Sequence, residues 1–226
     1  MAYRFAQTPA HSYLETTSPP NWHATDYFSV SVWARTLEAA NLYTLFHMLH
    51  VQGDGGKRNE YTLQLVQEGS VFKPRWAVYQ KGTLYYLDST TTWATSNTDW
   101  HNVVAAADRD GGYIYLSVDG ETPASKGSVK FPETAITTFR VSGTGTTGRA
   151  INGEIAEVGL YDCNLAASAY GGDRAALVKG FVPARLRPAN LLAYWPLVRG
   201  LQDHVGGRTL TAYNDPVVVE HPRVIA

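Results

Sequence analysis

The sequence predicts an all-β fold, a two-sheet antiparallel sandwich with one short helix and a C-terminal strand extension. Short apolar runs alternate with polar residues and recur at a spacing of about 8–12 residues. Turns rich in Gly and Asp separate these runs. Of the 226 residues, 12% are aromatic and only 17% are charged. Because aromatic and β-branched residues favour strands, the composition agrees with the pattern.

Five runs show the alternation expected of strands with one buried face. They are residues 28–33, 61–66, 75–79, 83–87 and 113–118. Between them, glycines in the clusters 52–56, 108–112 and 118–121 supply the positive φ angles of tight turns. We therefore expect successive strands to be joined as antiparallel hairpins.

One segment differs from this pattern. Its alanines and leucines predict a short helix near residues 165–180, capped by Asp173 and ended by Gly180. Prolines then stiffen the connection to the apolar run 191–197, which predicts one more buried strand. The remaining tail is too short for a second domain. We expect a single domain over residues 1–226, whose tail, residues 181–226, completes the sandwich or docks on a neighbouring subunit.

Net charge, apolar runs and cysteine content limit the classes of partner and compartment that we expect. The chain has 19 Lys and Arg against 20 Asp and Glu, a formal net charge of −1. Without a basic surplus we expect no nucleic-acid partner. No apolar run has the length of a membrane span or a signal peptide, so we expect no membrane association and synthesis in a cytoplasm. The single cysteine, Cys163, has no disulfide partner in the chain and is expected to be an inert, partly buried thiol.

Three stretches resemble the concanavalin A-like, laminin-G-like jelly-roll family. Residues 28–34 place Trp33 after alternating small and β-branched residues. Residues 100–120 are similar to the family hairpin W-H-x-V-A…D-G…L-Y-V-D-G, and residues 151–161 to its strand G-x-I-x-E-V-R-I-Y. The resemblance covers about residues 3–176 and implies the sandwich fold, on which calcium-binding loops and glycoside hydrolases also occur.

The tail departs from that family pattern. Residues 192–197 resemble the segment that usually opens such domains, yet here they lie near the end of the chain. Either the domain is circularly permuted, or Tyr194 and Trp195 dock on a neighbouring subunit. We favour the intrachain arrangement, because permutation is tolerated where termini lie close together.

The proline-rich link and the A-Y-W-P-L tail also resemble structural proteins of tailed bacteriophages. This resemblance implies a non-catalytic virion protein, most simply a capsid decoration protein. Such a protein would be made in the host cytoplasm, sit on the virion surface, bind the major capsid protein and self-associate, for example as a trimer. The alternative is a carbohydrate-binding, lectin-like module that recognises a host surface glycan from the head or the tail.

Candidate catalytic residues do not form a convincing set. A retaining glycosidase needs two carboxylates about 5 Å apart. Glu154 and Glu157 are three residues apart, so on a regular strand they face opposite sides unless a bulge intervenes. His47 and His50 are also three residues apart, so on the expected strand they face opposite sides. No third zinc ligand follows at a recognisable spacing. His101 is expected to pack beside its neighbouring tryptophan. We expect no enzymatic activity.

Two sets of residues remain as binding candidates. Aromatic residues cluster at Trp76, Tyr79, Tyr85 and Trp93, and we predict a glycan or protein interface there. Since neighbouring strand positions alternate, at least one of Tyr85 and Tyr86 should point outward.

The second set concerns calcium. No cofactor is expected, but four loop residues have oxygen ligands suited to Ca²⁺: Asp54, Asn59, Asp108 and Asp110. Stabilisation of turns by these side chains is the favoured interpretation.

Overall fold

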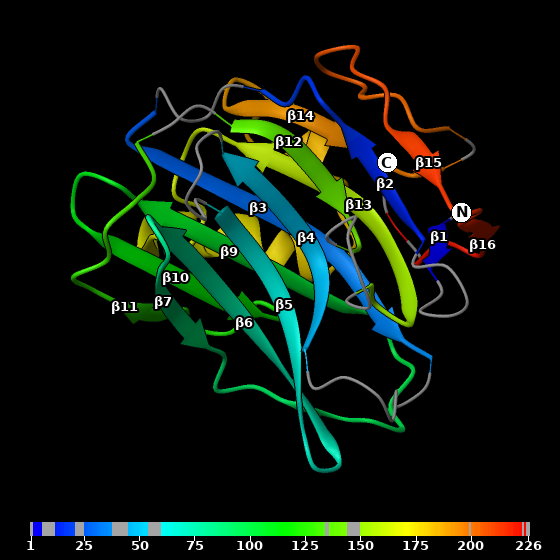
Figure 1. Ribbon diagram of the computed structural model, residues 1–226, viewed down its shortest axis with the longest axis horizontal. Helices are drawn as coiled ribbons and strands as arrows, with labels where there is room; N and C mark the ends of the chain where they lie inside the picture. Colours follow the sequence, from blue (N-terminus) through cyan, green and yellow to red (C-terminus); the bar gives the residue numbers. More distant parts are fainter. Residues whose placement is uncertain are drawn as a thin grey trace.

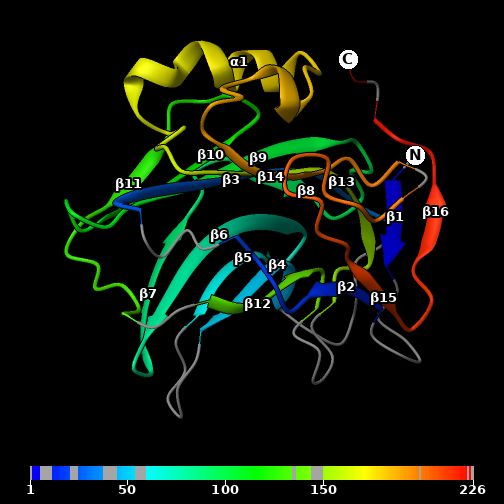
Figure 2. The ribbon, with the colours of Figure 1, turned by 90° about the horizontal axis from the view of Figure 1, so that it is seen from above.

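Two antiparallel β-sheets face one another in the computed structural model, and a short helix lies on the outer face of one of them (Figures 1 and 2). The structure describes residues 2–5, 12–20, 25–37, 45–53, 60–133, 136–143, 150–198, 200–222 and 224, with backbone only over 45–53. The predicted all-β sandwich with one short helix is confirmed.

Sheet A has the strand order β11-β10-β9-β3-β13-β1-β16, and β14 also pairs with β13. Its strands are β1 (Ala2–Phe5), β3 (Tyr27–Thr36), β9 (His101–Asp108), β10 (Tyr113–Val118), β11 (Ala124–Lys126), β13 (Gly153–Tyr161), β14 (Leu191–Trp195) and β16 (Val217–Val219).

Sheet B has the order β15-β2-β12-β4-β5-β6-β7, and β8 pairs with β6. Its strands are β2 (Tyr13–Thr16), β4 (Leu45–Gly53), β5 (Glu60–Glu68), β6 (Val71–Gln80), β7 (Thr83–Asp88), β8 (Trp93–Ala94), β12 (Ile136–Val141) and β15 (Thr211–Tyr213).

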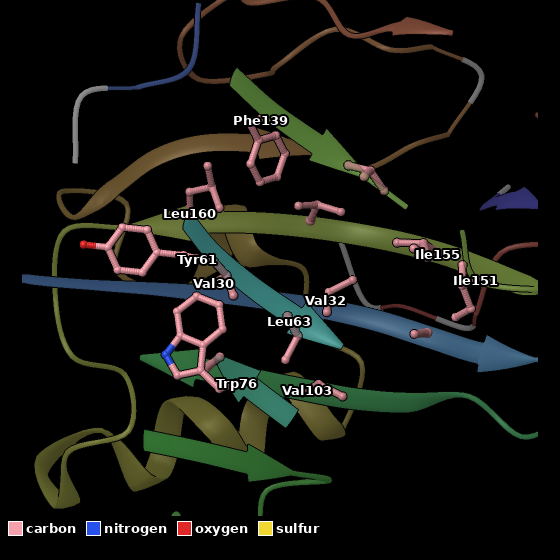
Figure 3. Packing of buried hydrophobic residues seen from close by; sticks show 14 of the residues in the cluster. Val30, Val32, Tyr61, Leu63, Trp76, Val103, Phe139, Ile151, Ile155 and Leu160 are labelled. Atoms are coloured by element: carbon pink, nitrogen blue, oxygen red, sulfur yellow. The ribbon is translucent and has the colours of Figure 1, made fainter. Parts of the chain in front are cut away.

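The hydrophobic core fills the space between the two sheets (Figure 3). Alternation on β3 turns Val30 and Val32 inward, and the same alternation on β5 turns Leu63 inward. Trp76 of β6 is 1% exposed, and its indole Nε1 donates a hydrogen bond to the Ala106 carbonyl of sheet A at 3.1 Å. The period of two seen in the sequence therefore builds the core.

The two ends of the chain complete both sheets. One edge of β13 pairs with β3, and its other edge is shared by β1 at residues 153–155 and β14 at residues 158–161. The C-terminal strands then extend the N-terminal ones, since β16 pairs with β1 and β15 pairs with β2. Tyr194 and Trp195 are buried within this chain, where Trp195 stacks on Phe139 with ring centroids 5.2 Å apart.

The helical segment follows β13 and covers the outer face of sheet A (Figure 2). It contains a single 3₁₀ turn (Ser168–Tyr170) and helix α1 (Gly171–Val178). The expectation that Asp173 caps the helix is wrong, because Asp173 lies in the first turn and binds Arg187 at 2.8 Å. Gly180 ends the helix as expected, with φ of 90°. Among the described residues, no helix is long and apolar enough to cross a membrane.

We expect Trp195→Ala to lower the free energy of unfolding by about 3–5 kcal/mol, since it removes a large, fully buried ring. Chemical denaturation monitored by circular dichroism measures this. Val217→Ala, at a 58% exposed position of β16, is the matched control and should change stability by less than about 0.5 kcal/mol. Equal effects of both substitutions would contradict the assignment of β14 to the core of this chain.

Candidate functional site

The aromatic cluster predicted as a binding surface lies mostly in the interior. Trp76 is in the core, and Trp93 is 4% exposed because β8 folds back on β6 and places its ring over His101. Tyr79 is 9% exposed, and Tyr85 packs against the core. The prediction of a glycan or protein interface is wrong for Trp76, Tyr79 and Trp93, because buried rings have no free face for a sugar or a partner. Tyr85 is partly buried.

Tyr86 is the member of the Tyr85–Tyr86 pair that points outward, as the alternation requires. Two cationic side chains already contact its ring. The guanidinium carbon of Arg75 lies 4.0 Å from the ring centroid and Nζ of Lys126 lies 5.1 Å from it. These contacts occupy the ring and hold the β7 edge of sheet B to β11 of sheet A.

Of the four calcium candidates, the structure describes Asp108 and Asp110. Asp54 and Asn59 lie outside the described residues. Asp110 is exposed in the β9–β10 turn, and Asp108 Oδ1 accepts the Gly111 N–H at 2.7 Å within the same turn. In the part of the chain that the structure describes, no three His, Cys, Asp or Glu side chains are grouped as metal ligands.

The parity argument for the two glutamates fails, because β13 contains a bulge. The register with β3 shifts between Ala156 and Gly159, and Glu157 has a positive φ of 52°. Both carboxylates therefore lie on the outer face of sheet A. Each is buried and occupied by its own partners.

Glu154 accepts hydrogen bonds from Arg4 and from Arg35 Nε, the latter at 2.7 Å. Glu157 accepts one from the Tyr194 hydroxyl and lies 2.8 Å from His221 Nε2.

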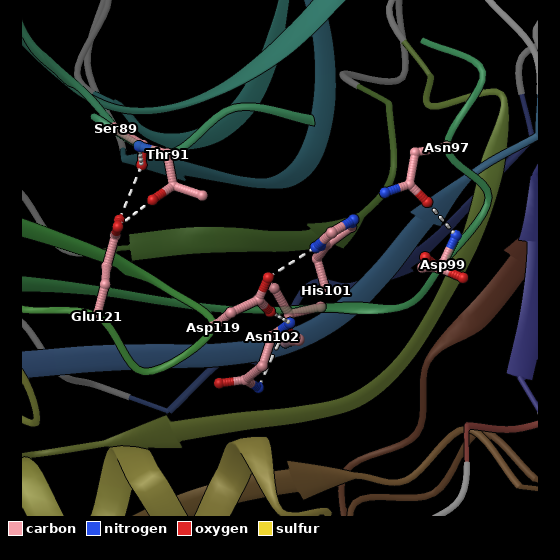
Figure 4. A network of polar contacts seen from close by, with 9 residues as sticks. Ser89, Thr91, Asn97, Asp99, His101, Asn102, Asp119 and Glu121 are labelled. Carbon is pink, nitrogen blue, oxygen red and sulfur yellow. Dashed lines mark hydrogen bonds and ion pairs between the residues drawn. The ribbon is translucent and has the colours of Figure 1, made fainter. Parts of the chain in front are cut away.

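The histidines also have structural surroundings. His101 stacks on Trp93, with ring centroids 4.2 Å apart, and its Nδ1 lies 2.7 Å from Asp119 Oδ2 (Figure 4). Nearby, Glu121 accepts hydrogen bonds from Ser89 and Thr91. His47 and His50 belong to β4, a strand as expected, but their side chains lie outside the described residues.

A pocket of about 490 Å³ lies on the outer face of sheet A, beside the segment that precedes helix α1. Aromatic, acidic and amide side chains line it: Tyr27, Asp108, Tyr115, Asp162, Cys163, Asn164, Ala167, Tyr170 and Asn190. We call it the Asp108 pocket. Its volume is in the range of small-ligand sites.

One wall of the Asp108 pocket comes from the sheet. Tyr27, Asp108 and Tyr113 are cross-strand neighbours in one row, and Tyr115 lies two residues from Tyr113 on the same face. Tyr27 and Tyr113 are 41% and 44% exposed, and Tyr27 and Tyr115 belong to the lining of the pocket. Burial raises the pKa of Tyr115, and the nearby Asp108 carboxylate raises it further. Ile114 points into the core, so Tyr113 and Tyr115 on either side of it must point outward. This alternation was the sequence signal that could have identified these tyrosines.

The other wall is the segment from the end of β13 to helix α1. Ser29 on β3 holds it, since its Oγ donates to the Cys163 carbonyl at 2.5 Å and accepts the Leu165 N–H at 2.9 Å. Buried Arg174 donates from Nη1 to the carbonyls of Leu165 and Ala167 at 2.6 and 3.0 Å. These buried hydrogen bonds fix the wall in place.

The side chains of this wall also contact one another. Asp162 Oδ1 accepts a hydrogen bond from Asn190 Nδ2 at 2.8 Å, and Asn164 Oδ1 accepts the Ala166 N–H at 3.0 Å. The Arg187 guanidinium lies 4.7 Å from the centroid of the Tyr170 ring. Both aspartates of the pocket are therefore oriented by neighbours.

A smaller pocket of about 300 Å³ lies between β2 and β15. Its charged groups are paired within the chain. Glu15 binds Arg140 at 2.5 Å, and Arg208 binds buried Asp203 at 3.0 Å. The Asp108 pocket is the better candidate site, because its carboxylates have no cationic partner among the described residues that line it.

Cys163 should react slowly with iodoacetamide at pH 8. Burial, with a contribution from Asp162, raises its pKa from 9.0 to about 11, which lowers the thiolate fraction about a hundredfold. Mass spectrometry of the alkylated protein over time measures the rate. Denaturant should restore rapid labelling, and a native rate equal to the denatured rate would contradict the buried, neutral thiol.

Solved structures with similar folds come from several kinds of protein. A proposed carbohydrate-binding protein from Bacteroides ovatus has a TM-score of 0.63 and 16% identity, covering 100% of this chain and 61% of that one. The CBM40 of a Ruminococcus gnavus sialidase, bound to α2,3-sialyllactose, has a TM-score of 0.50 and 15% identity, covering 74% of this chain and 97% of that one.

The third is tailspike protein 2 of Escherichia coli O157:H7 bacteriophage CAB120, with a TM-score of 0.54 and 16% identity. The match covers 86% of this chain and 26% of the tailspike chain. At these identities the likeness shows the fold.

No curated protein sequence matches the chain significantly. The family model of the concanavalin A-like lectin/glucanases superfamily, laminin G type, matches residues 8–169. The match spans most of the sequence and includes strands β2 to β13, among them the family hairpin and the β13 segment described above. The chain belongs to the concanavalin A-like lectin/glucanases superfamily.

Proposed function

We propose that this protein is a non-catalytic, lectin-like domain that binds a glycan in the Asp108 pocket. The observation that carries the proposal is the convergence of tyrosine rings with carboxylate and amide groups in one cavity. A pyranose ring presents C–H faces that pack on aromatic rings and hydroxyls that need hydrogen-bond partners. The pocket offers both kinds of contact.

The carboxylates keep acceptor capacity for a ligand. Within the described residues, Asp108 and Asp162 each use one oxygen, Oδ1, for a hydrogen bond inside the protein. The Oδ2 atoms remain available to accept hydrogen bonds from sugar hydroxyls. Because Oδ1 is already bonded, each carboxylate is held in a defined orientation before a ligand arrives.

Preorganisation of the walls favours binding. Ser29 and Arg174 fix the backbone between residues 163 and 167 through buried hydrogen bonds. A ligand therefore does not have to order this segment, and less of its interaction free energy is lost to conformational entropy.

The absence of catalysis is part of this proposal. Glu154 lies between two arginines and Glu157 between Tyr194 and His221, and both are fully buried. A general acid or base must reach the substrate, and these groups are enclosed by their own partners. The fold similarity to carbohydrate-binding proteins supports a binding role.

We expect Tyr27→Ala and Tyr115→Ala each to weaken glycan binding about tenfold, because each removes an aromatic face of the pocket. A glycan array identifies the ligand, and isothermal titration calorimetry measures the affinity. Tyr86→Ala changes a tyrosine on sheet B that is about as exposed as Tyr27; it is the matched control and should bind as the unmodified protein does.

Thermal unfolding of each variant separates loss of contact from loss of fold. The bound glycan should be recovered intact, and EDTA should leave the affinity unchanged. Release of shorter sugars, or equal losses for Tyr86→Ala and Tyr27→Ala, would overturn the proposal.

A second candidate function is an accessory subunit of a phage particle, placed on the virion surface as a capsid decoration or tail component. The similarity to a tailspike protein over 86% of this chain favours it. In this role the domain would contact virion proteins such as the major capsid protein and could bind a host glycan through the same pocket.

Cryo-electron microscopy of phage particles incubated with the purified chain tests this role. We expect density for the sandwich at regular positions, because a structural subunit occupies symmetry-related sites. Light scattering of the free protein reports whether it self-associates. Particles without added density, together with a monomer in solution, would contradict the virion role and leave the lectin role.

A further inference from the structure

We infer that the Asp108 pocket selects uncharged sugars and rejects acidic ones such as sialic and uronic acids. This inference rests on the proposed function. Two carboxylates, Asp108 and Asp162, belong to the pocket, and none of its described lining residues is Lys, Arg or His. A ligand carboxylate would meet like charge without a compensating cation.

The arginines closest to the pocket are engaged elsewhere. Arg109 follows Asp108 in the chain, but its Nη1 and Nη2 donate to the carbonyls of Thr25 and Pro132, both at 3.4 Å. Arg187 lies over Tyr170 and binds Asp173 at 2.8 Å. Both guanidinium groups are therefore already bonded within the chain.

The pKa values of two groups in the pocket are shifted in the direction that nearby negative charge produces. The pKa of Tyr115 is raised by burial and then by Asp108, and the pKa of Cys163 is raised by burial and then by Asp162. Arg187 acts on Cys163 in the opposite direction, but its effect is smaller than that of Asp162. These directions agree with a lining that holds two carboxylates and no Lys, Arg or His.

Uncharged sugars complement this arrangement. Their hydroxyls donate hydrogen bonds to carboxylate oxygens, and such charge-assisted bonds are stronger than neutral ones. An acidic sugar gains no such bond from its carboxylate and is repelled by both aspartates. Near a protein surface the effective dielectric is well below that of water, and two like charges about 4 Å apart repel each other strongly enough for discrimination of at least about tenfold.

Paired probes test the inference. A glycan array should carry neutral oligosaccharides beside the same oligosaccharides with a terminal sialic or uronic acid, for example lactose and sialyllactose. We expect the unmodified protein to bind the neutral member of each recognised pair at least about tenfold more tightly than the acidic one. Equal or stronger binding of the acidic members would overturn the inference and leave the proposed function standing.

Substitutions assign the selectivity to the pocket. Asp108→Asn and Asp162→Asn remove the charge and keep an oxygen that can accept the hydrogen bonds of Gly111 and Asn190. The double variant should bring the neutral-to-acidic ratio close to one. Asp110→Asn, an exposed carboxylate in the adjacent turn, is the matched control and should keep the original ratio.

The outcomes separate the two proposals. Absence of binding to any glycan would overturn the proposed function and the inference with it. An unchanged ratio in the folded double variant would show that these aspartates do not set selectivity. If the double variant does not fold, the ratio measured with the unmodified protein decides.

Discussion

The buried carboxylate of Glu157 joins the segments on which the sandwich depends. At this residue β13 bulges. The edge of β13 opposite β3 pairs with β1 before the bulge and with β14 after it. The Glu157 N–H donates to the Pro196 carbonyl at 3.3 Å, and its carboxylate binds Tyr194 and lies beside His221, in the segment that follows β16. One residue therefore connects a central strand with two parts of the tail. Removing a single partner of such a buried charge is costly, because the remaining charge loses its compensation.

The same strand also determines the geometry of the candidate site. Beyond the bulge, β13 turns Leu160 inward and Tyr161 toward the helical segment, and the chain leaves the sheet at Asp162. Ser29 lies on the neighbouring β3, in register with Tyr161, and holds the departing chain. A shift of one residue in this register would reverse the faces and move the wall that carries Asp162. The pocket is thus a consequence of strand pairing as well as of local sequence.

Much of the fold could be predicted from the sequence because it depends on local periodicity. The alternation of β3 and β10 and the glycines of the β9–β10 turn assign strands and hairpins directly. The site was less predictable. Trp76 and Tyr86 belong to the same aromatic cluster, and only the register of β6 with β7 decides that one is core and the other exposed. The bulge at Glu157 and the pairing of Asp162 with Asn190 depend on contacts between distant residues, which no spacing rule encodes.

Burial and pairing assign different roles to four carboxylates on the outer face of sheet A. Glu154 and Glu157 are enclosed, and each is bonded through both oxygens, so their charges stabilise the packing of the chain ends. Asp108 and Asp162 are partly exposed and face a cavity lined by tyrosines, and among the described residues each is held through one oxygen. The first pair has no capacity left for a ligand, whereas the second combines a fixed orientation with an available acceptor. The superfamily fold provides both environments on one sheet face, and the partners of each carboxylate distinguish a structural charge from one that can recognise a ligand.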